Sequence, residues 1–402
     1  MSTPGDTLNA ARGRGDRIIG FLRDIVAIPS LSGQEEPVIR RIEQEMRDVG
    51  FDEVRIDPLG NILGRVGDGP RVVAFDAHID TVDVQDRDQW ECDPFKGKLE
   101  DGLVYGRGAV DQKAGMAAMV HAGAIMKELG LLEGVQVWMV GSVMEEDCDG
   151  LCWNYILQEK KLAPEFVIST EPTNMRLNRG HRGRMEIRVR VRGRSCHGAM
   201  PHLGDNAVYR IAPAITAIEQ LNERLADDPF LGKGTCAISW IGCKTPSLCA
   251  VPDEAEFHID RRLTRGETRE SALREVEEAL AAAGVEAEVF TLTYREPGWT
   301  GLVYPMDKYF PTWVLDEDHP VLAAAQDAYR RTLGREPEVS RWNFSTNGVS
   351  IMGLHGVPCL GLGPGPEEQA HRANEHCPAD HVIEACAVYA ALPARWAAVS
   401  RV

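Results

Sequence analysis

No stretch of this sequence is apolar for long enough to span a lipid bilayer, which takes about 20 residues. Its first residues, "MSTPGDTLNAARGRGDR", contain no apolar segment of the kind found in a secretory signal. Basic residues are also scarce: 44 Lys and Arg stand against 61 Asp and Glu, for a formal net charge of −17. Nucleic acid and anionic membrane surfaces bind clustered basic residues. We therefore expect a cytoplasmic protein that binds neither nucleic acid nor membrane.

Cysteine pairs at redox or metal-binding spacing are absent as well. The ten cysteines are scattered, and none forms a C-x-x-C pair. In a cytosolic chain we expect them to be reduced and to pack as small apolar residues. Cys148 and Cys196 lie within motifs of interest, but neither has an assigned base, so we do not expect a nucleophilic thiol. The glycines of "YGRGAVDQKAG" do not follow the spacing of a dinucleotide-binding loop.

The sequence is long enough for two domains: it has 402 residues, of which 44% are hydrophobic. Apolar residues at helical spacing predict two helices between residues 17 and 51, and turn residues predict a hairpin between Val54 and Leu63. The runs "RVVAFDAHID", "GVQVWMVGSVMEED" and "PEFVIST" predict buried strands, and "GAVDQKAGMAAMVHAGAIMKELG" predicts a helix. This alternation indicates an α/β fold, with a mostly parallel mixed sheet flanked by helices.

The pattern changes near residue 183. "MEIRVRVRG" alternates apolar and charged residues, which is typical of an antiparallel strand with one solvated face. The segments that follow predict the order β-α-β-β-α-β, which is that of a ferredoxin-like α+β domain. Buried α/β character returns in "HPVLAAAQDAYRRTLG" and "GVPCLGLGPG". We therefore predict a main domain formed by residues 1–182 and 295–402, with an inserted domain at 183–294.

Polar side chains follow the first predicted buried strand, where the chain leaves the core. His78 and Asp80 are two residues apart, so they share one face of an extended chain. An imidazole with a carboxylate beside it is a usual arrangement for a metal ligand and the group that orients it. Asp111 lies at the start of the predicted helix. A surface histidine near a turn and a helix-capping aspartate are the plainer interpretations of these residues.

The same device recurs at other strand ends. Glu145 and Glu146 follow the second buried strand, Glu171 follows the third, and His371 lies in a Gly- and Pro-rich loop. Adjacent negative charges at a strand end reduce stability unless a cation neutralises them, although a solvated loop remains the alternative. Two imidazoles with several carboxylates suit zinc, cobalt or manganese. With so many ligands, we expect one carboxylate to bridge two metals about 3.5–4 Å apart.

The motifs "AHIDTV", "GRGAVDQKAG", "MEEDCDG", "STEPT", "CHGAMPHLGDNA" and "AHRANE" resemble those of the M20 metallopeptidases. This family includes acetylornithine deacetylases, succinyl-diaminopimelate desuccinylases, aminoacylases and glutamate carboxypeptidases. The resemblance runs nearly from end to end and includes the inserted domain, which it identifies as a lid and dimerisation domain. Within the family, the chain is most similar to a subgroup of hydrolases named for a link to selenium metabolism.

The resemblance implies two divalent metal ions per subunit, with zinc expected first and cobalt or manganese as alternatives. His78 and Glu171 would bind one ion, Glu146 and His371 the other, and Asp111 would bridge both.

The resemblance also implies roles around the metals. Glu145 would be the general base, Asp80 would orient the metal-binding histidine, and His197 of one subunit would stabilise the oxyanion in the other. Arg262 in "HIDRRL" matches an arginine that binds the substrate carboxylate.

Besides a mild change at Ala77, where the family often has glycine, two positions depart from the family pattern. Cys249 in "CAVP" replaces an asparagine that contacts substrate, and Asn347 in "STNG" replaces an acidic residue. Both substrate-binding positions therefore differ from those expected for the common acylamino-acid substrates, whereas the metal ligands are all present.

Together these features predict a metal-dependent hydrolase that cleaves the amide bond of a small N-acyl or N-carbamoyl amino-acid-like substrate, as a homodimer paired through the lid. A dipeptidase or carboxypeptidase of the same family is the first alternative. A binding protein that keeps the fold without catalysis is the second. Such a protein usually lacks a metal ligand or the base, and here all six candidate residues are present.

Overall fold

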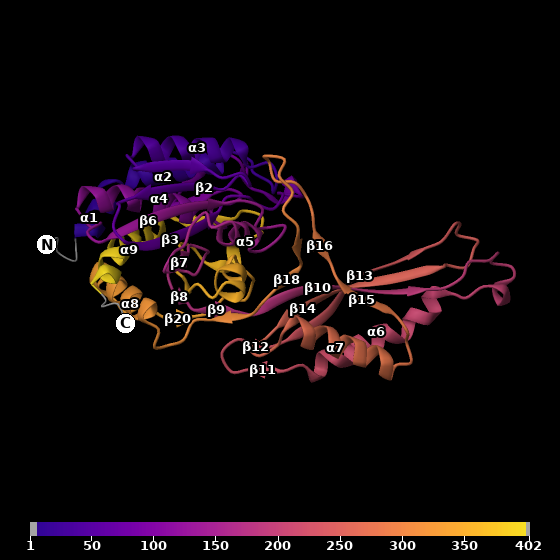
Figure 1. Cartoon of the computed structure of the whole chain (residues 1–402). Coiled ribbons are helices and arrows are strands. Elements are labelled where there is room, and N and C mark those ends of the chain that lie inside the picture. Colours follow the sequence, from indigo (N-terminus) through magenta and orange to yellow (C-terminus); the bar gives the residue numbers. More distant parts are fainter. Residues whose placement is uncertain (1–5, 399–402) are drawn as a thin grey trace.

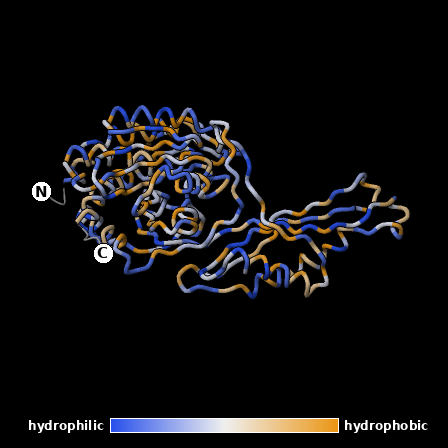
Figure 2. Tube along the Cα trace, in the orientation of Figure 1, coloured by the Kyte–Doolittle hydropathy of each residue, from blue (hydrophilic) through white to orange (hydrophobic). Residues whose placement is uncertain are grey.

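In the computed structural model, the described residues 6–398 fold around two separate hydrophobic cores. The larger lobe contains an eight-stranded sheet in the order β1-β2-β6-β3-β7-β21-β8-β20, flanked by helices. The smaller lobe is elongated and projects to one side of the larger one (Figure 1). Along the outer helices of the larger lobe, hydrophilic residues alternate with hydrophobic ones (Figure 2).

The centre of the large sheet is parallel and buried, as the sequence predicted. Its four central strands are β6 (Val135–Ser142), β3 (Arg71–His78), β7 (Phe166–Ser169) and β21 (Cys359–Gly361). The outer strands are the predicted antiparallel hairpin β1 (Glu53–Ile56) and β2 (Ile62–Val66), and at the other edge β8 (Leu177–Asn178) and β20 (Val339–Ser340). The mixed α/β class is therefore confirmed.

Helices cover the large sheet. They are α1 (Asp6–Gly13), α2 (Gly15–Val26), α3 (Glu36–Asp48), α4 (Lys113–Glu128), α5 (Leu151–Gln158), α8 (Pro320–Leu333) and α9 (Ala379–Ala397). The two helices expected between residues 17 and 51 are α2 and α3, and the small-residue helix is α4. Helices α1, α5 and α9 were not predicted from the sequence. No helix among residues 6–398 is both long enough and apolar enough to cross a membrane.

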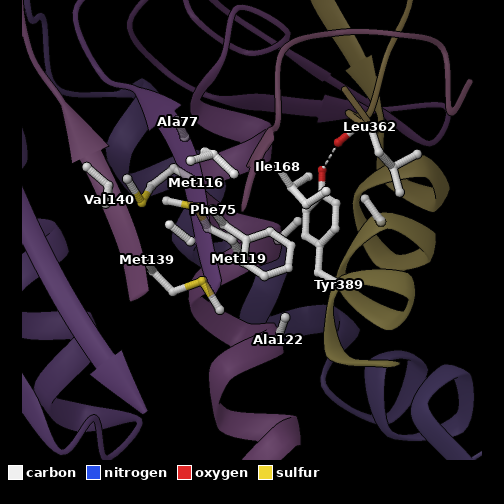
Figure 3. Packing of buried hydrophobic residues seen from close by; sticks show 14 of the residues in the cluster. Phe75, Ala77, Met116, Met119, Ala122, Met139, Val140, Ile168, Leu362 and Tyr389 are labelled. Carbon is white, nitrogen blue, oxygen red and sulfur yellow. Dashed lines mark hydrogen bonds between the residues drawn. The ribbon is translucent and has the colours of Figure 1, made fainter. Parts of the chain in front are cut away.

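The core around strand β3 shows how α4 and α9 are held against the sheet (Figure 3). Phe75 of β3 lies 5.3 Å from Tyr389 of α9, measured between ring centroids. The Tyr389 hydroxyl donates a hydrogen bond to the carbonyl of Leu362, so a buried phenol keeps a polar partner. Gly115 allows α4 to approach closely, because a Cβ atom there would lie 2.1 Å from the Thr170 hydroxyl. The start of α4 is thus packed directly against the end of β7.

A short sheet brings two distant loops together beside this core. Strand β22 (His376–Pro378) pairs with β5 (Leu103–Tyr105), which pairs with β4 (Lys98–Glu100). The loop that contains His371 therefore lies next to the loop that precedes α4. This pairing is needed for the site described below.

The smaller lobe has the predicted β-α-β-β-α-β order. Its elements are β10 (Gly183–Arg192), α6 (Ala207–Arg224), β13 (Thr235–Lys244), β14 (Glu254–Leu263), α7 (Arg269–Ala282) and β15 (Glu288–Thr291). The sheet is antiparallel, in the order β13-β14-β10-β15, with β18 (Tyr309–Phe310) also paired to β10. Along β10 every second residue is buried, because one face packs on the helices and the other is more exposed.

Short strand pairs complete the connections: β11 (Asp227–Asp228) with β12 (Gly232–Lys233), β16 (Thr293–Tyr294) with β17 (Met306–Asp307), and β9 (Gly180–His181) with β19 (Trp313–Val314). The predicted boundaries at 182/183 and 294/295 fall immediately before β10 and immediately after β16.

Candidate metal centre

The candidate site lies at the carboxyl ends of three neighbouring parallel strands. His78 is the last residue of β3, Glu145 and Glu146 follow β6, and Glu171 follows β7. Asp111 precedes α4, which packs against the end of β7. Because parallel strands end at one edge of a sheet, side chains that are distant in sequence meet there.

The five predicted metal ligands are brought together. His78 Nε2 lies 2.9 Å from Asp111 Oδ1 and 3.6 Å from Glu171 Oε1. His371 Nε2 lies 3.0 Å from Glu146 Oε2 and 3.3 Å from the other oxygen of Asp111. The Asp111 carboxylate thus stands between the two imidazoles, with one oxygen toward each. This is the placement required of a residue that bridges two ions.

The donor set fits divalent cations. Five carboxylates converge with two imidazoles, and buried oxygens of Asp80, Glu145 and Glu171 have no hydrogen-bond donor among residues 6–398. Burying carboxylate oxygens without partners costs free energy that a cation would recover. Ligand atoms of His78, Asp111 and Glu146 all lie within 4.8 Å of one another, and so do those of His78, Glu145 and Glu171.

The electrostatics of the cluster point the same way. Burial raises the pKa of Glu145 well above its ordinary value, and nearby Asp149 and Glu171 add to the shift while His78 opposes it. Hydrogen bonds to Asp111 and Glu146 raise the pKa of His371 to about 10. The site therefore carries an excess of negative charge that positive ions would neutralise.

Asp80 supports the site differently from the expectation. The Nδ1–H of His78 donates to the backbone carbonyl of Asp80 at 2.9 Å, whereas the Asp80 carboxylate lies 3.6 Å from this nitrogen. The carboxylate instead accepts from the Ser32 hydroxyl at 2.7 Å and from the backbone N–H of Glu146 at 3.0 Å. In this arrangement, the main chain of residue 80 orients the imidazole and its side chain secures the Glu146 segment.

The segment after β6 is fixed by three side chains from other parts of the chain. Its backbone N–H groups donate to buried acceptors: Val143 to Asn61 (3.0 Å), Met144 to Glu35 (3.1 Å) and Glu146 to Asp80 (3.0 Å). Met144 has a φ angle of +62°, a left-handed conformation that is uncommon for a residue with a side chain. These bonds hold the turn that points Glu145 and Glu146 into the site.

Glu375 fastens the two loops that face each other across the site. Its carboxylate accepts hydrogen bonds from Arg107 Nη1 at 2.7 Å and from the N–H groups of Val110 and Asp111 at 2.9 and 3.1 Å. Glu375 is fully buried and lies four residues after His371. It therefore links the His371 loop to the Asp111 loop, a role that the spacing alone did not reveal.

The candidate metal centre opens into a cavity of about 320 Å³ between the two lobes. Arg262 of β14 lies in its wall, as expected for a group that binds substrate. Arg184 and Asp149 lie in the same wall, and neither was predicted from the sequence. Phe344 and Ser345 supply part of the remaining surface.

Four predicted site residues do not line this cavity, and one of them is Asp80, described above. His197 and Cys249 are exposed on the smaller lobe and do not line the cavity formed within one chain. Asn347 is fully buried, and its amide donates to Asp76 at 2.9 Å and to the Ser142 hydroxyl at 3.1 Å. Its oxygen accepts from the backbone N–H of Gly150 at 3.0 Å. The expected substrate contact of Asn347 is corrected here to a structural one, because its hydrogen-bonding groups are already occupied.

The sequence profile of peptidase family M20/M25/M40 matches residues 74–395, and the chain belongs to this family. The resemblance inferred from the motifs is thereby confirmed, and the protein is a hydrolase of the M20 peptidase and amidohydrolase class. The narrower similarity to the subgroup linked to selenium metabolism stays a prediction.

Relatives and solved structures agree with this assignment. The chain is 52% identical over 378 residues to the uncharacterized protein YgeY of Escherichia coli (strain K12), with 94% of each chain covered. It is 26% identical over 382 residues to succinyl-diaminopimelate desuccinylase of Corynebacterium glutamicum, covering 93% of this chain and 95% of that one.

Two solved structures show the same fold at low sequence identity. The M20 family metallo-carboxypeptidase Sso-CP2 of Sulfolobus solfataricus has a TM-score of 0.73 at 16% identity, covering 95% of this chain and 99% of that one. YxeP of Bacillus subtilis, described as a dinuclear metal binding peptidase, has a TM-score of 0.70 at 16% identity, covering 95% and 98%.

Proposed function

We propose that this protein is a two-metal amidohydrolase acting on small N-acyl or N-carbamoyl amino-acid-like substrates. The observation that carries the proposal is the convergence of two imidazoles and four carboxylates of the candidate metal centre on one cavity that also presents Arg262. Carboxylates with unpartnered oxygens suit cations, and a guanidinium suits a substrate carboxylate. The cavity volume of about 320 Å³ matches a small molecule.

The five residues brought together would hold the cations. His78 and Glu171 would bind one ion, His371 and Glu146 the other, and Asp111 would bridge them; zinc is proposed, with cobalt or manganese as alternatives. Divalent cations held there would lower the pKa of a water molecule and polarise the carbonyl of the scissile amide. Imidazole and carboxylate ligands are compatible with all three metals.

Glu145 would move the proton. Its Oε1 is buried and unpartnered among the described residues, and its Oε2 lies 4.0 Å from His78 Nε2. A carboxylate in this position would take a proton from the attacking water as the new C–O bond forms. It would return the proton to the nitrogen as the C–N bond breaks, so that an acid and an amine leave.

The direct test is metal content combined with hydrolysis. Protein purified without chelator should contain about two equivalents of divalent metal per chain, the stoichiometry of a two-metal site. It should cleave members of a panel of N-acetyl, N-succinyl and N-carbamoyl amino acids faster than dipeptides. If the purified protein contained no metal and stayed inactive after divalent metal was added, the proposal would be refuted. Faster cleavage of dipeptides would favour the dipeptidase alternative.

We further propose that the enzyme works as a homodimer paired through the smaller lobe. Strand β13 is an edge strand of its sheet, and its Trp240 and Ile241 are 47% and 52% exposed. Unpaired edges with apolar side chains favour association. Pairing there would allow His197 of one copy to approach the cavity of the other. A monomer by light scattering at the concentration of the activity assay would contradict this.

A further inference from the structure

One acidic side chain in the cavity wall is not used by the proposed metal centre. Asp149 lines the cavity, and its side chain is 8% exposed. Its Oδ1 accepts a hydrogen bond from Arg184 Nη2 at 2.7 Å. Its Oδ2 is buried and has no donor among residues 6–398. A buried carboxylate oxygen without a partner carries a desolvation cost, which a donor on a bound molecule would remove.

The same wall offers unpaired donors. Arg184 and Arg262 stand opposite each other on β10 and β14. Two nitrogens of Arg262 bind Asp260 at 2.8 and 2.9 Å, which leaves Nη1 without an acceptor in the described part of the chain. The Nε–H of Arg184 is buried and likewise unpartnered there. A carboxylate is the ligand that such guanidinium groups bind best.

The acceptor and the donors are adjacent, because Asp149 is hydrogen-bonded to Arg184 and Arg184 faces Arg262. A molecule that satisfies both must carry a carboxylate with an N–H group close to it. An α-amino acid has this arrangement, with nitrogen and carboxylate on one carbon atom. An N-acyl compound that has no nitrogen on the carbon bearing the carboxylate would leave Asp149 Oδ2 without a hydrogen-bond donor.

We propose that Asp149 is a specificity-determining residue that accepts a hydrogen bond from a substrate N–H group on the carbon bearing the carboxylate. The inference rests on the proposed function and concerns amino-acid-like substrates whose scissile amide nitrogen is not itself attached to that carbon. An ammonium and a ureido group both provide this N–H, the first with a positive charge and the second without. Among substrates of this kind, the cavity would thus favour those that present such an N–H donor to Asp149.

The experiment compares three acetamides of one length: Nγ-acetyl-2,4-diaminobutyrate, its α-ureido analogue, and 4-acetamidobutyrate, which has no nitrogen on the α-carbon. We expect metal-loaded wild type to cleave one or both donor-bearing compounds with a kcat/KM about 10- to 100-fold above the third, the range expected for a hydrogen bond to a charged group. The ammonium and ureido compounds separate a charged donor from a neutral one.

The variant Asp149→Asn should bring this ratio close to one, because its amide replaces the carboxylate. Asp147→Asn is the matched control: Asp147 is exposed in the same acidic segment, accepts from the Tyr294 hydroxyl at 3.0 Å and does not line the cavity. It should keep the wild-type ratio. If Asp149→Asn fails to fold, the ratio of wild-type kcat/KM values for the donor-bearing compounds and 4-acetamidobutyrate still tests the proposal.

Equal wild-type rates, a preference for 4-acetamidobutyrate, or a ratio that survives Asp149→Asn would overturn the proposal for Asp149. The proposed function would stand in those cases, because amide cleavage itself would still be seen. If wild type cleaved none of these compounds nor any amide of the wider panel, the proposed function would fail, and this inference with it.

Discussion

At the scale of single residues, adjacent carboxylates in this protein have different surroundings. Glu146 Oε2 lies 3.0 Å from His371, whereas Glu145 Oε1 is buried without a partner in the described chain. Burial raises the pKa of Glu145 well above its ordinary value, which is the direction expected for a proton-transferring carboxylate. Neighbours in the sequence can therefore serve as base and ligand because their environments differ.

The variant Glu145→Gln should retain the metal but lose catalysis. Glutamine keeps the size of the side chain and cannot accept the proton, so we expect kcat to fall by about 10²- to 10⁴-fold. Metal content by mass spectrometry should stay near that of wild type. Glu146→Gln is the contrasting variant, in which metal content should fall together with activity. Near-normal kcat in Glu145→Gln would remove this residue from the role of base.

At the scale of elements, the turn after β6 shows how the fold positions chemistry. Its conformation is held by side chains from the residue that precedes α3, the β1–β2 hairpin and the segment after β3. Burial and the nearby negative charge of Asp80 raise the pKa of Glu35 to about 8. Glu35 is therefore mainly neutral at pH 7, and its Oε1 accepts the Met144 N–H as a carboxylic acid oxygen.

Removing this support should affect turnover more than substrate binding. In Glu35→Ala the buried N–H of Met144 loses its acceptor, which should destabilise the fold by about 1–3 kcal/mol. The displaced Glu145 should lower kcat while KM changes little. Glu35→Gln preserves an acceptor of the same shape and should restore most of the activity. If both variants behaved alike, the hydrogen bond to Met144 would not be what positions the turn.

At the scale of the whole molecule, a buried histidine away from the site should make stability depend on pH. His121 of α4 is fully buried, and its Nε2 lies 3.5 Å from a carboxylate oxygen of Glu45. Neither ring nitrogen has a hydrogen bond within residues 6–398. Burial lowers its pKa to about 3, and the positive charges of Arg17, Arg14 and Arg41 add to the effect. Below its ordinary pKa of about 6.5, the unfolded chain takes up a proton that the folded chain does not. Stability is therefore fully present above pH 6.5 and is lost as the pH falls toward 3.

Between pH 7 and pH 5 this residue should reduce the free energy of unfolding by about 2 kcal/mol. We expect His121→Leu, measured by urea denaturation, to show a pH dependence smaller than that of wild type by this amount. His202→Gln, a change at an exposed position of the smaller lobe, should leave the pH dependence unchanged. Equal pH dependence in wild type and His121→Leu would show that His121 is not shielded as the structure indicates.

The order of residues along the chain was sufficient to predict the alternating strands and helices, the inserted β-α-β-β-α-β lobe and the side chains that gather at strand ends. Each of these leaves a local mark, either as hydrophobic periodicity or as a polar residue where a buried run stops. His78 and Glu171 were found in this way, because each lies at or directly after the end of a buried strand.

Only the tertiary structure decided which partners these side chains have. Glu375 accepts a hydrogen bond from the backbone N–H of Asp111, 264 positions away in the chain. The buried Asn347 donates a hydrogen bond to Asp76. Arg184 of the other lobe donates to one oxygen of Asp149, and the second oxygen has no donor among residues 6–398. Such contacts leave no periodic pattern in the sequence. They depend on how packed elements meet in space, whereas sequence periodicity reflects the local geometry of a single helix or strand.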